Sequence, residues 1–403
     1  MGIRRLKPYE GPTLFSYGFR PFFLFGAIYA GLSVAIWLPL YAGELTLPTA
    51  FSPRDWHVHE MLYGYVPAVV TGFLLTAIPN WTGRLPLQGR ALIVLVAVWC
   101  AGRLAVAFSA TIGWLPALMI DCGFLLLVAA AAAREIAVGR NWGNLKVVAL
   151  LGLLATGNVC FHVEAHASGT ADHGIRVGLA VVVMLITLIG GRIVPSFTRN
   201  WLTRDAGSAA HRFALRRRLP APFGRFDLIA VGAGAASLLS WIVAPESIPT
   251  GIAMLAAGLL HIVRLSRWAG DRTLREPLVL ILHLGYAFVP LGFVLSGLAA
   301  LGVMSAAAGI HAFAGGAIGT MTLAVMTRAS LGHTGRALHA SGITQTIYAA
   351  VVLAALLRVA AALAPAYALP MLTAAGTLWV AAFAGFGLAY GPIVARRRVD
   401  ARG

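Results

Sequence analysis

Charged side chains are scarce in this chain. Only 11% of its 403 residues are charged, whereas 59% are hydrophobic. A soluble globular protein has about 25% charged residues. Acidic residues are the scarcest class, with 14 Asp and Glu against 31 Lys and Arg, which gives a formal net charge of +17. The composition excludes an ordinary soluble protein and indicates a chain that lies mainly in lipid.

Cysteine is also sparse, and the usual cysteine motifs are missing. Cys100, Cys122 and Cys160 all fall in apolar runs. The sequence has no Cys-x-x-Cys-His for covalent haem attachment and no paired-cysteine zinc pattern. Residues 1–19 carry basic residues but no continuous apolar core, so we expect the first span, rather than a cleaved leader, to act as the targeting signal.

Long apolar runs dominate what is present. A helix needs about 20 apolar residues to cross the hydrocarbon of a bilayer. By that measure the sequence predicts an all-α, polytopic helix bundle with twelve transmembrane helices, forming a single integral membrane domain over residues 1–403. The expected spans are 20–42, 58–80, 90–108, 111–133, 145–167, 175–198, 226–244, 248–266, 277–300, 303–327, 340–363 and 367–393.

The basic residues gather in alternate connections. One set of connections, together with both chain ends, holds nearly all of the arginines, and the other set holds only Arg54 and Arg176. Since cytoplasmic loops are enriched in Lys and Arg, this pattern places both termini in the cytoplasm. It predicts a long basic cytoplasmic loop at 199–225, between helices six and seven. It also explains the net charge without any nucleic acid partner.

Three of the spans resemble one another. A histidine lies near the predicted outer end of spans two, six and ten: His59, His173 and His311. The sequence separation from His59 to Arg84 equals that from His311 to Arg336. This spacing hints at three pseudo-repeats of four helices. Transporter folds often place their binding sites between internal repeats.

Histidines cluster at the predicted outer side. Because polar groups inside a bilayer are costly, each is a candidate functional residue. Asn158, His162 and His166 share one helical face, and two histidines four residues apart can bind one metal ion. His57 and His59 lie two apart and point in different directions on a regular helix. We therefore expect His59 to face the bundle and His57 to lie at its rim.

Several charged residues could support such a site. A ligating imidazole needs an acceptor for its other ring nitrogen, and Glu60 and Glu164 are close enough in sequence to serve. Arg103 and Arg192 are expected to be buried and to pair with a carboxylate or with haem propionates. Asp121 lies mid-span and could pair with Arg103 on the neighbouring helix. His283 is a spare ligand candidate in the inner half of span nine.

Six segments resemble the NnrS family of membrane proteins. They are Phe19–Leu24, Trp56–Met61, Gly72–Gly83, Pro195–Asn200, Arg275–Tyr286 and Gly316–Gly335. The resemblance implies a twelve-helix protein of the bacterial inner membrane that contains haem and copper. It also implies a role in nitric oxide metabolism and in tolerance of nitrosative stress. It assigns no ligand to any histidine.

The architecture is also similar to the catalytic subunit of haem–copper oxidases. There, histidines on the second and tenth helices hold a low-spin haem. That similarity implies a b-type haem on His59 and His311, near Arg103 and Arg192, and copper on His162, His166, His173 and His57. The adjacent His-His pair and the His-Pro-Glu motif of the oxidases are absent here, which argues against oxygen reduction.

The sequence thus predicts a haem- and copper-binding protein that handles nitric oxide or its products, with Glu60 and Tyr63 as candidates for proton transfer. Turnover by haem or copper redox chemistry, and the electron donor it would need, are left open. The alternative is a secondary transporter of a small anion or metal complex, because twelve spans also fit two halves of six. A haem-bearing sensor or assembly factor is a third option.

Overall fold

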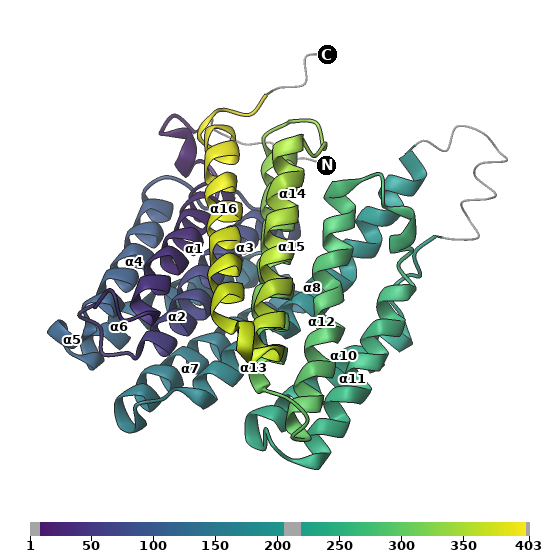
Figure 1. Ribbon diagram of the computed structural model, residues 1–403. Coiled ribbons are helices and arrows are strands. Elements are labelled where there is room, and N and C mark those ends of the chain that lie inside the picture. The colour runs from purple at the N-terminus through teal and green to yellow at the C-terminus, as the bar shows by residue number, and fades with distance from the viewer. Residues whose placement is uncertain (1–8, 205–218, 400–403) are drawn as a thin grey trace. The chain divides into compact units, whose positions relative to one another are not determined.

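The computed structural model describes residues 9–204 and 219–399, and these residues form helices without any strand. Twelve of the helical segments are long and apolar enough to cross a membrane (Figure 1), which confirms the predicted number and places every predicted span within a few residues. The elements are α1 (Phe19–Tyr41), α2 (Pro53–His59), η2 (Glu60–Tyr65), α3 (Val66–Thr82), α4 (Arg90–Ala107), α5 (Ser109–Ile112), α6 (Trp114–Val138), α7 (Leu145–Ser168), α8 (Asp172–Arg204), α10 (Arg225–Val243), α11 (Ile248–Ser266), α12 (Pro277–Ala300), α13 (Ala306–His311), η5 (Ala312–Gly319), α14 (Thr320–His333), α15 (Gly342–Leu363) and α16 (Ala368–Ala395).

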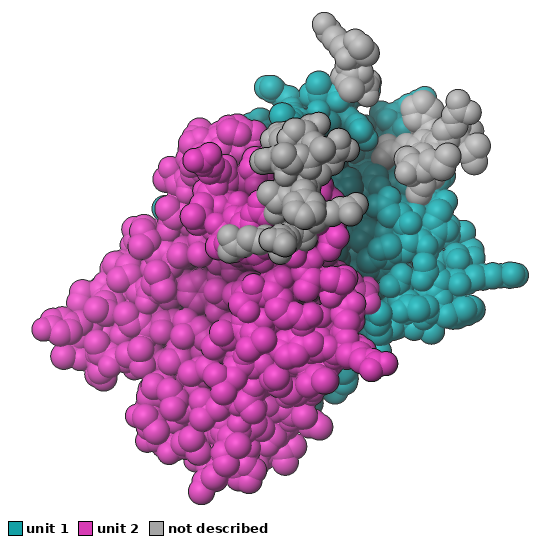
Figure 2. All heavy atoms as spheres, turned by 90° about the vertical axis from the view of Figure 1, so that its right-hand side faces the viewer, with its two compact units in different colours: residues 1–181, 326–337, 380–403 teal, residues 182–325, 338–379 magenta. Residues whose placement is uncertain are grey.

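The chain divides into two compact units, coloured separately in Figure 2. Unit 1 comprises residues 1–181, 326–337 and 380–403, and unit 2 comprises 182–325 and 338–379. Three helices, α8, α14 and α16, contribute residues to both units. Unit 1 contains the whole of α1 to α7, and unit 2 contains α10 to α13 and α15.

The predicted basic loop is shorter than expected at its start. Helix α8 continues to Arg204, and α10 begins at Arg225. Residues 205–218 of that loop lie outside the described residues. Arg199, which was expected in the loop, is helical and donates from Nη2 to the carbonyl oxygen of Pro220 at 2.7 Å. The two described ends of the connection are therefore held together.

Two spans contain a π-helical stretch directly after a histidine. His59 is the last residue of α2 and is followed by η2, and His311 is the last residue of α13 and is followed by η5. A π-helical turn holds an additional residue, shifts the faces of the helix on either side of it, and is frequent at functional sites. The parallel adds to the predicted likeness of spans two and ten, while the three-fold repeat stays a prediction.

Small residues bring the helices of unit 1 close together around one buried polar cluster. Helix α4 packs on α6, and α6 packs on α7. At Gly102 of α4, an added Cβ would lie only 3.2 Å from the Cα of Asp121 on α6. This close approach sets Arg103, the next residue, beside the Asp121 carboxylate.

Candidate metal centre

Four neighbouring spans of unit 1 supply the cluster. His59 ends α2 and Glu60 begins η2, Arg103 lies on α4 and Asp121 on α6. Helix α7 contributes Asn158 and His162, one turn apart. All six residues are buried, with His59, Glu60 and Asn158 at 0% exposure.

Arg103 joins the two carboxylates of the cluster. Its Nη1 donates to both oxygens of Glu60 at 2.8 Å, and its Nη2 donates to Oδ1 of Asp121. The pairing of Arg103 with Asp121 that the sequence suggested is confirmed. Burying a charge without a partner is very costly, so this bridge is what allows two carboxylates to share an apolar interior.

Glu60 accepts hydrogen bonds on every side. Tyr29 of α1 donates its hydroxyl to Oε2, Arg103 donates to both oxygens, and Nδ1 of His59 lies 2.8 Å from Oε1. An ionised carboxylate offers about four acceptor positions, whereas a protonated one must also place a hydrogen of its own. The number of donors around Glu60 therefore indicates the anion.

The imidazole of His59 faces oxygen atoms on both sides. Because Nδ1 donates to Glu60, the neutral ring has a lone pair at Nε2. Nε2 lies 2.9 Å from Oδ1 of Asn158 and 3.2 Å from Oδ2 of Asp121. In a neutral ring that lone pair would point at two acceptors, so a proton or a metal cation is needed between them.

The orientation of Asn158 follows from the same contacts. Its Nδ2 donates to Oδ2 of Asp121 at 2.7 Å, which leaves its Oδ1 toward His59. Turning the amide over would satisfy His59 but would set an amide oxygen against the Asp121 carboxylate. In either orientation the cluster lacks one positive charge.

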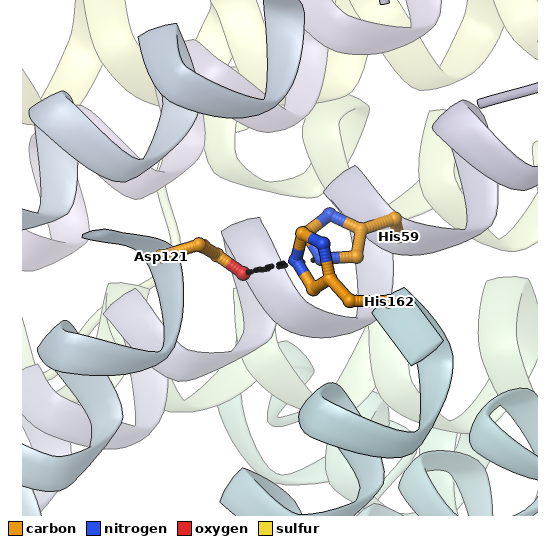
Figure 3. A group of neighbouring side chains, drawn as sticks. All are labelled: His59, Asp121 and His162. Carbon is orange, nitrogen blue, oxygen red and sulfur yellow. Dashed lines mark hydrogen bonds and ion pairs between the residues drawn. The ribbon is translucent and has the colours of Figure 1, made fainter. Parts of the chain in front are cut away.

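His59, Asp121 and His162 could hold that charge as a metal ion (Figure 3). One ligand atom from each residue lies within 4.8 Å of the other two. The Nε2 of His162 is 3.3 Å from Oδ2 of Asp121, the same oxygen that faces His59. The ring of Phe51 packs on both histidines, and the ring of Phe161 packs on His59.

The donor set fits a transition metal. Imidazole nitrogen suits zinc, copper and iron, and a single carboxylate completes a set used for such ions. The second nitrogen of His59 is already fixed by Glu60, as is usual for a metal-binding histidine. The residues present therefore fit a metal ion, and the donor types alone suit several metals.

The other predicted copper residues lie outside this triad. His57 stacks on Trp37 with ring centroids 4.2 Å apart, and His166 stacks on Trp114 at 4.3 Å. His173 is exposed, and its Nδ1 lies 2.6 Å from Oε1 of Glu164. The predicted divergence of His57 from His59 is thus seen in their separate surroundings.

Glu164 and Tyr63 bond to the backbone at the start of α8. Glu164 accepts from the amide of Gly174 at 2.7 Å and from that of His173 at 3.3 Å, so it caps the helix. Tyr63 donates to the carbonyl oxygen of Gly174 at 2.6 Å while its ring packs on His59. In these contacts both side chains hold α8 against the site.

In unit 2, Arg192 differs from its expected burial. Its side chain is exposed, whereas Gly191 and Val194 on the same helix are buried. The prediction of a buried Arg192 was wrong because the residue lies on the exposed face of α8, away from the packed helices. His311 is half-buried, and the Nε2 of His283 lies 2.8 Å from Oγ1 of Thr198.

Unit 2 contains a buried ion pair of its own, which the sequence analysis missed. Arg264 of α11 donates from Nε to Asp227 of α10 at 2.9 Å, and from Nη1 to the hydroxyl of Tyr286 at 2.8 Å. His261 places Nδ1 3.0 Å from the same hydroxyl. The signal was available as one Arg and one Asp inside adjacent apolar spans.

Tyr29 and Asn158 were also missed as parts of the site. Asn158 had been placed on the stripe of His162 without a role of its own, and Tyr29 is one of many aromatic residues in a span. Asp121 carried a clearer signal, since a mid-span carboxylate is rare. Only tertiary contacts bring them together: Tyr29 of α1 bonds to Glu60 of η2, and Asn158 of α7 contacts His59 at the end of α2.

Comparison with known proteins agrees with the resemblance seen in the sequence. The family model described as NnrS protein matches residues 13–398, nearly the whole chain. No curated protein matches the chain.

Proposed function

Because this chain belongs to the NnrS protein family, whose members are membrane proteins related to nitric oxide, we propose that it acts in nitric oxide metabolism. We propose further that it uses a metal ion bound at His59, Asp121 and His162. The proposal includes copper as that metal and protection from nitrosative stress as the outcome. It also places the chain in the bacterial inner membrane with both termini in the cytoplasm.

One observation carries the metal assignment. With Nδ1 donating to Glu60, a neutral His59 ring has its Nε2 lone pair facing two oxygen atoms, 2.9 and 3.2 Å away, in a buried site. A cation bound there would remove the repulsion and take His162 as a further ligand. Copper held by these residues would supply a coordination position at which nitric oxide can bind.

The chain's own residues would shape that site. Glu60 orients the His59 ring through Nδ1, and Arg103 holds Glu60 and Asp121 in place. The rings of Phe51 and Phe161 exclude water from the ligand atoms.

A b-type haem on His59 and His311, with Arg103 and Arg192 near its propionates, stays a separate prediction. His59 belongs to unit 1 and His311 to unit 2. Both residues end a helix directly before a π-helical stretch, and this is the observation that favours them as a related pair. His59 has a single lone pair at Nε2, so it can serve either the haem iron or the triad metal.

Metal analysis of the purified protein tests the triad. We expect one copper per chain in the wild type, and its loss in His162→Ala. His166→Ala, one turn further along α7 and stacked on Trp114, is the matched control and should keep the metal. Wild-type protein that takes up no metal would overturn the proposal and leave His59 as a buried imidazolium.

An optical spectrum separates the two uses of His59. Loss of a Soret band in both His59→Ala and His311→Ala, with His283→Ala unchanged, would assign His59 to haem. Loss of copper in His59→Ala and His162→Ala, with the His311→Ala variant unaffected, would assign it to the triad. Titration of the loaded protein with nitric oxide then distinguishes stoichiometric binding from turnover.

A further inference from the structure

The fixed charges around the triad do not cancel. Glu60 and Asp121 each carry a negative charge, and Arg103 carries one positive charge that both carboxylates share. Among the described residues, no other charged side chain forms an ion pair with these three apart from His59 and His162. With both histidines neutral, the buried cluster therefore has one net negative charge.

A single positive charge would neutralise this cluster. Charges interact strongly where the effective dielectric is low, and a net charge in an apolar interior is costly. A monovalent ion at His59 and His162 leaves the cluster neutral. A divalent ion leaves it with an excess positive charge, which would have to be balanced by a bound anion.

Asp121 is also a weaker metal ligand than its position suggests. Its Oδ1 accepts from Nη2 of Arg103, and its Oδ2 accepts from Nδ2 of Asn158 at 2.7 Å. These hydrogen bonds lower the electron density that the Asp121 oxygens could donate to a hard divalent ion. The two imidazoles are left as the principal donors, and imidazole binds copper readily.

Resting on the proposed metal site, we propose that Arg103 determines which charge of metal the triad accepts, and that with Arg103 in place the site selects cuprous copper over divalent ions. Arg103 is a specificity-determining residue in this account, since it touches the carboxylates and not the metal. Glu60, which pairs with Arg103, has the opposite effect: its negative charge favours divalent ions.

The charge of the cluster can be changed one unit at a time. Arg103→Gln makes it more negative, Glu60→Gln makes it neutral, and the double variant Glu60→Gln/Arg103→Gln restores the wild-type charge. Arg103→Lys keeps the charge while removing the forked geometry of the guanidinium. These four variants separate the effect of charge from that of shape.

The measurement is the affinity of each detergent-purified, metal-free protein for Cu(I) and for Zn(II). Cu(I) is titrated anaerobically against bicinchoninate and Zn(II) against a chelator of known affinity, in a buffer whose anions do not coordinate metals. We expect the wild type to bind Cu(I) more tightly than Zn(II). Arg103→Gln should lower that preference by about tenfold or more, because a divalent ion gains twice as much from the added negative charge.

The remaining variants should follow the charge. Glu60→Gln should raise the preference for Cu(I), and the double variant and Arg103→Lys should return it toward the wild-type value. Equal shifts in Arg103→Lys and Arg103→Gln, or a wild type that prefers Zn(II), would overturn the inference. If Arg103→Gln does not fold, Glu60→Gln and the double variant still test it.

Failure of this inference differs from failure of the metal site itself. Wild-type protein that binds neither ion refutes the proposed site. One ion per chain, lost in His162→Ala but with a preference that ignores the charge series, refutes only the role of Arg103.

Discussion

Asn158 donates a hydrogen bond of 2.7 Å from Nδ2 to Oδ2 of Asp121, between α7 and α6. This contact fixes the direction of the amide, so that its oxygen faces His59. The side chain therefore sets the electrostatic character of the site without carrying a charge.

Replacing Asn158 with Leu should destabilise the protein. The Asp121 carboxylate would lose a donor, and hydrogen bonds to charged groups contribute about 1.5–3 kcal/mol. Unfolding by heat in detergent measures the loss. Thr156→Val on the same helix is the control, since Thr156 is exposed and donates to the carbonyl of Gly152 within its own helix. Equal effects of the two changes would contradict the role given to Asn158.

Arg103→Met should be among the most destabilising changes in unit 1. Removing one partner of a buried ion pair costs about 3–5 kcal/mol, because the other charge stays buried. Arg84→Met is the matched control: Arg84 pairs with Glu135, but 37% of its side chain is exposed. An exposed pair contributes only about 0–1 kcal/mol. Thermal unfolding of both variants in the same detergent should show the difference clearly.

Gly191→Ala should disrupt the ion pair of unit 2. A Cβ at this position would lie 2.0 Å from Nη2 of Arg264, whose other nitrogens are held by Asp227, Tyr286 and the Thr187 carbonyl. The guanidinium cannot move without losing these bonds, so we expect a cost of about 3 kcal/mol, as for a broken buried pair.

Gly232→Ala provides the comparison for Gly191. It lies within α10, and an added Cβ would have no atom within 4 Å. Alanine is favoured over glycine in a helix by about 1 kcal/mol, so this variant should be neutral or slightly stabilised. A Gly191→Ala protein as stable as Gly232→Ala would show that the Arg264 site can relax.

Reporter fusions test the predicted orientation. Green fluorescent protein fused after Gly403 should fluoresce, because the distribution of basic residues predicts a cytoplasmic C-terminus. Alkaline phosphatase inserted at Gly169, between α7 and α8, should be active because that connection is predicted to face outward. Fluorescence and phosphatase activity in whole cells are the readouts, and the reverse pattern would contradict the charge-based topology.

The sequence alone determined the twelve spans and their approximate bounds. Backbone groups in a bilayer must be satisfied within each segment, so span length and apolar composition are enough to locate helices. Helical spacing also foresaw that His57 and His59 would diverge. Arg103 and Asp121 could be paired because they lie on consecutive spans, which pack together here as α4 and α6.

Only the tertiary structure decided which faces meet. A helix that is apolar all round carries no periodic sign of its buried side, and this is why Arg192 was placed inside when it lies outside. For the same reason His162 was grouped with His166, whereas contacts of α6 and α7 with the end of α2 join it with His59 and Asp121. The sequence shows which residue types are present, but which of them become neighbours depends on contacts between spans that are distant in sequence.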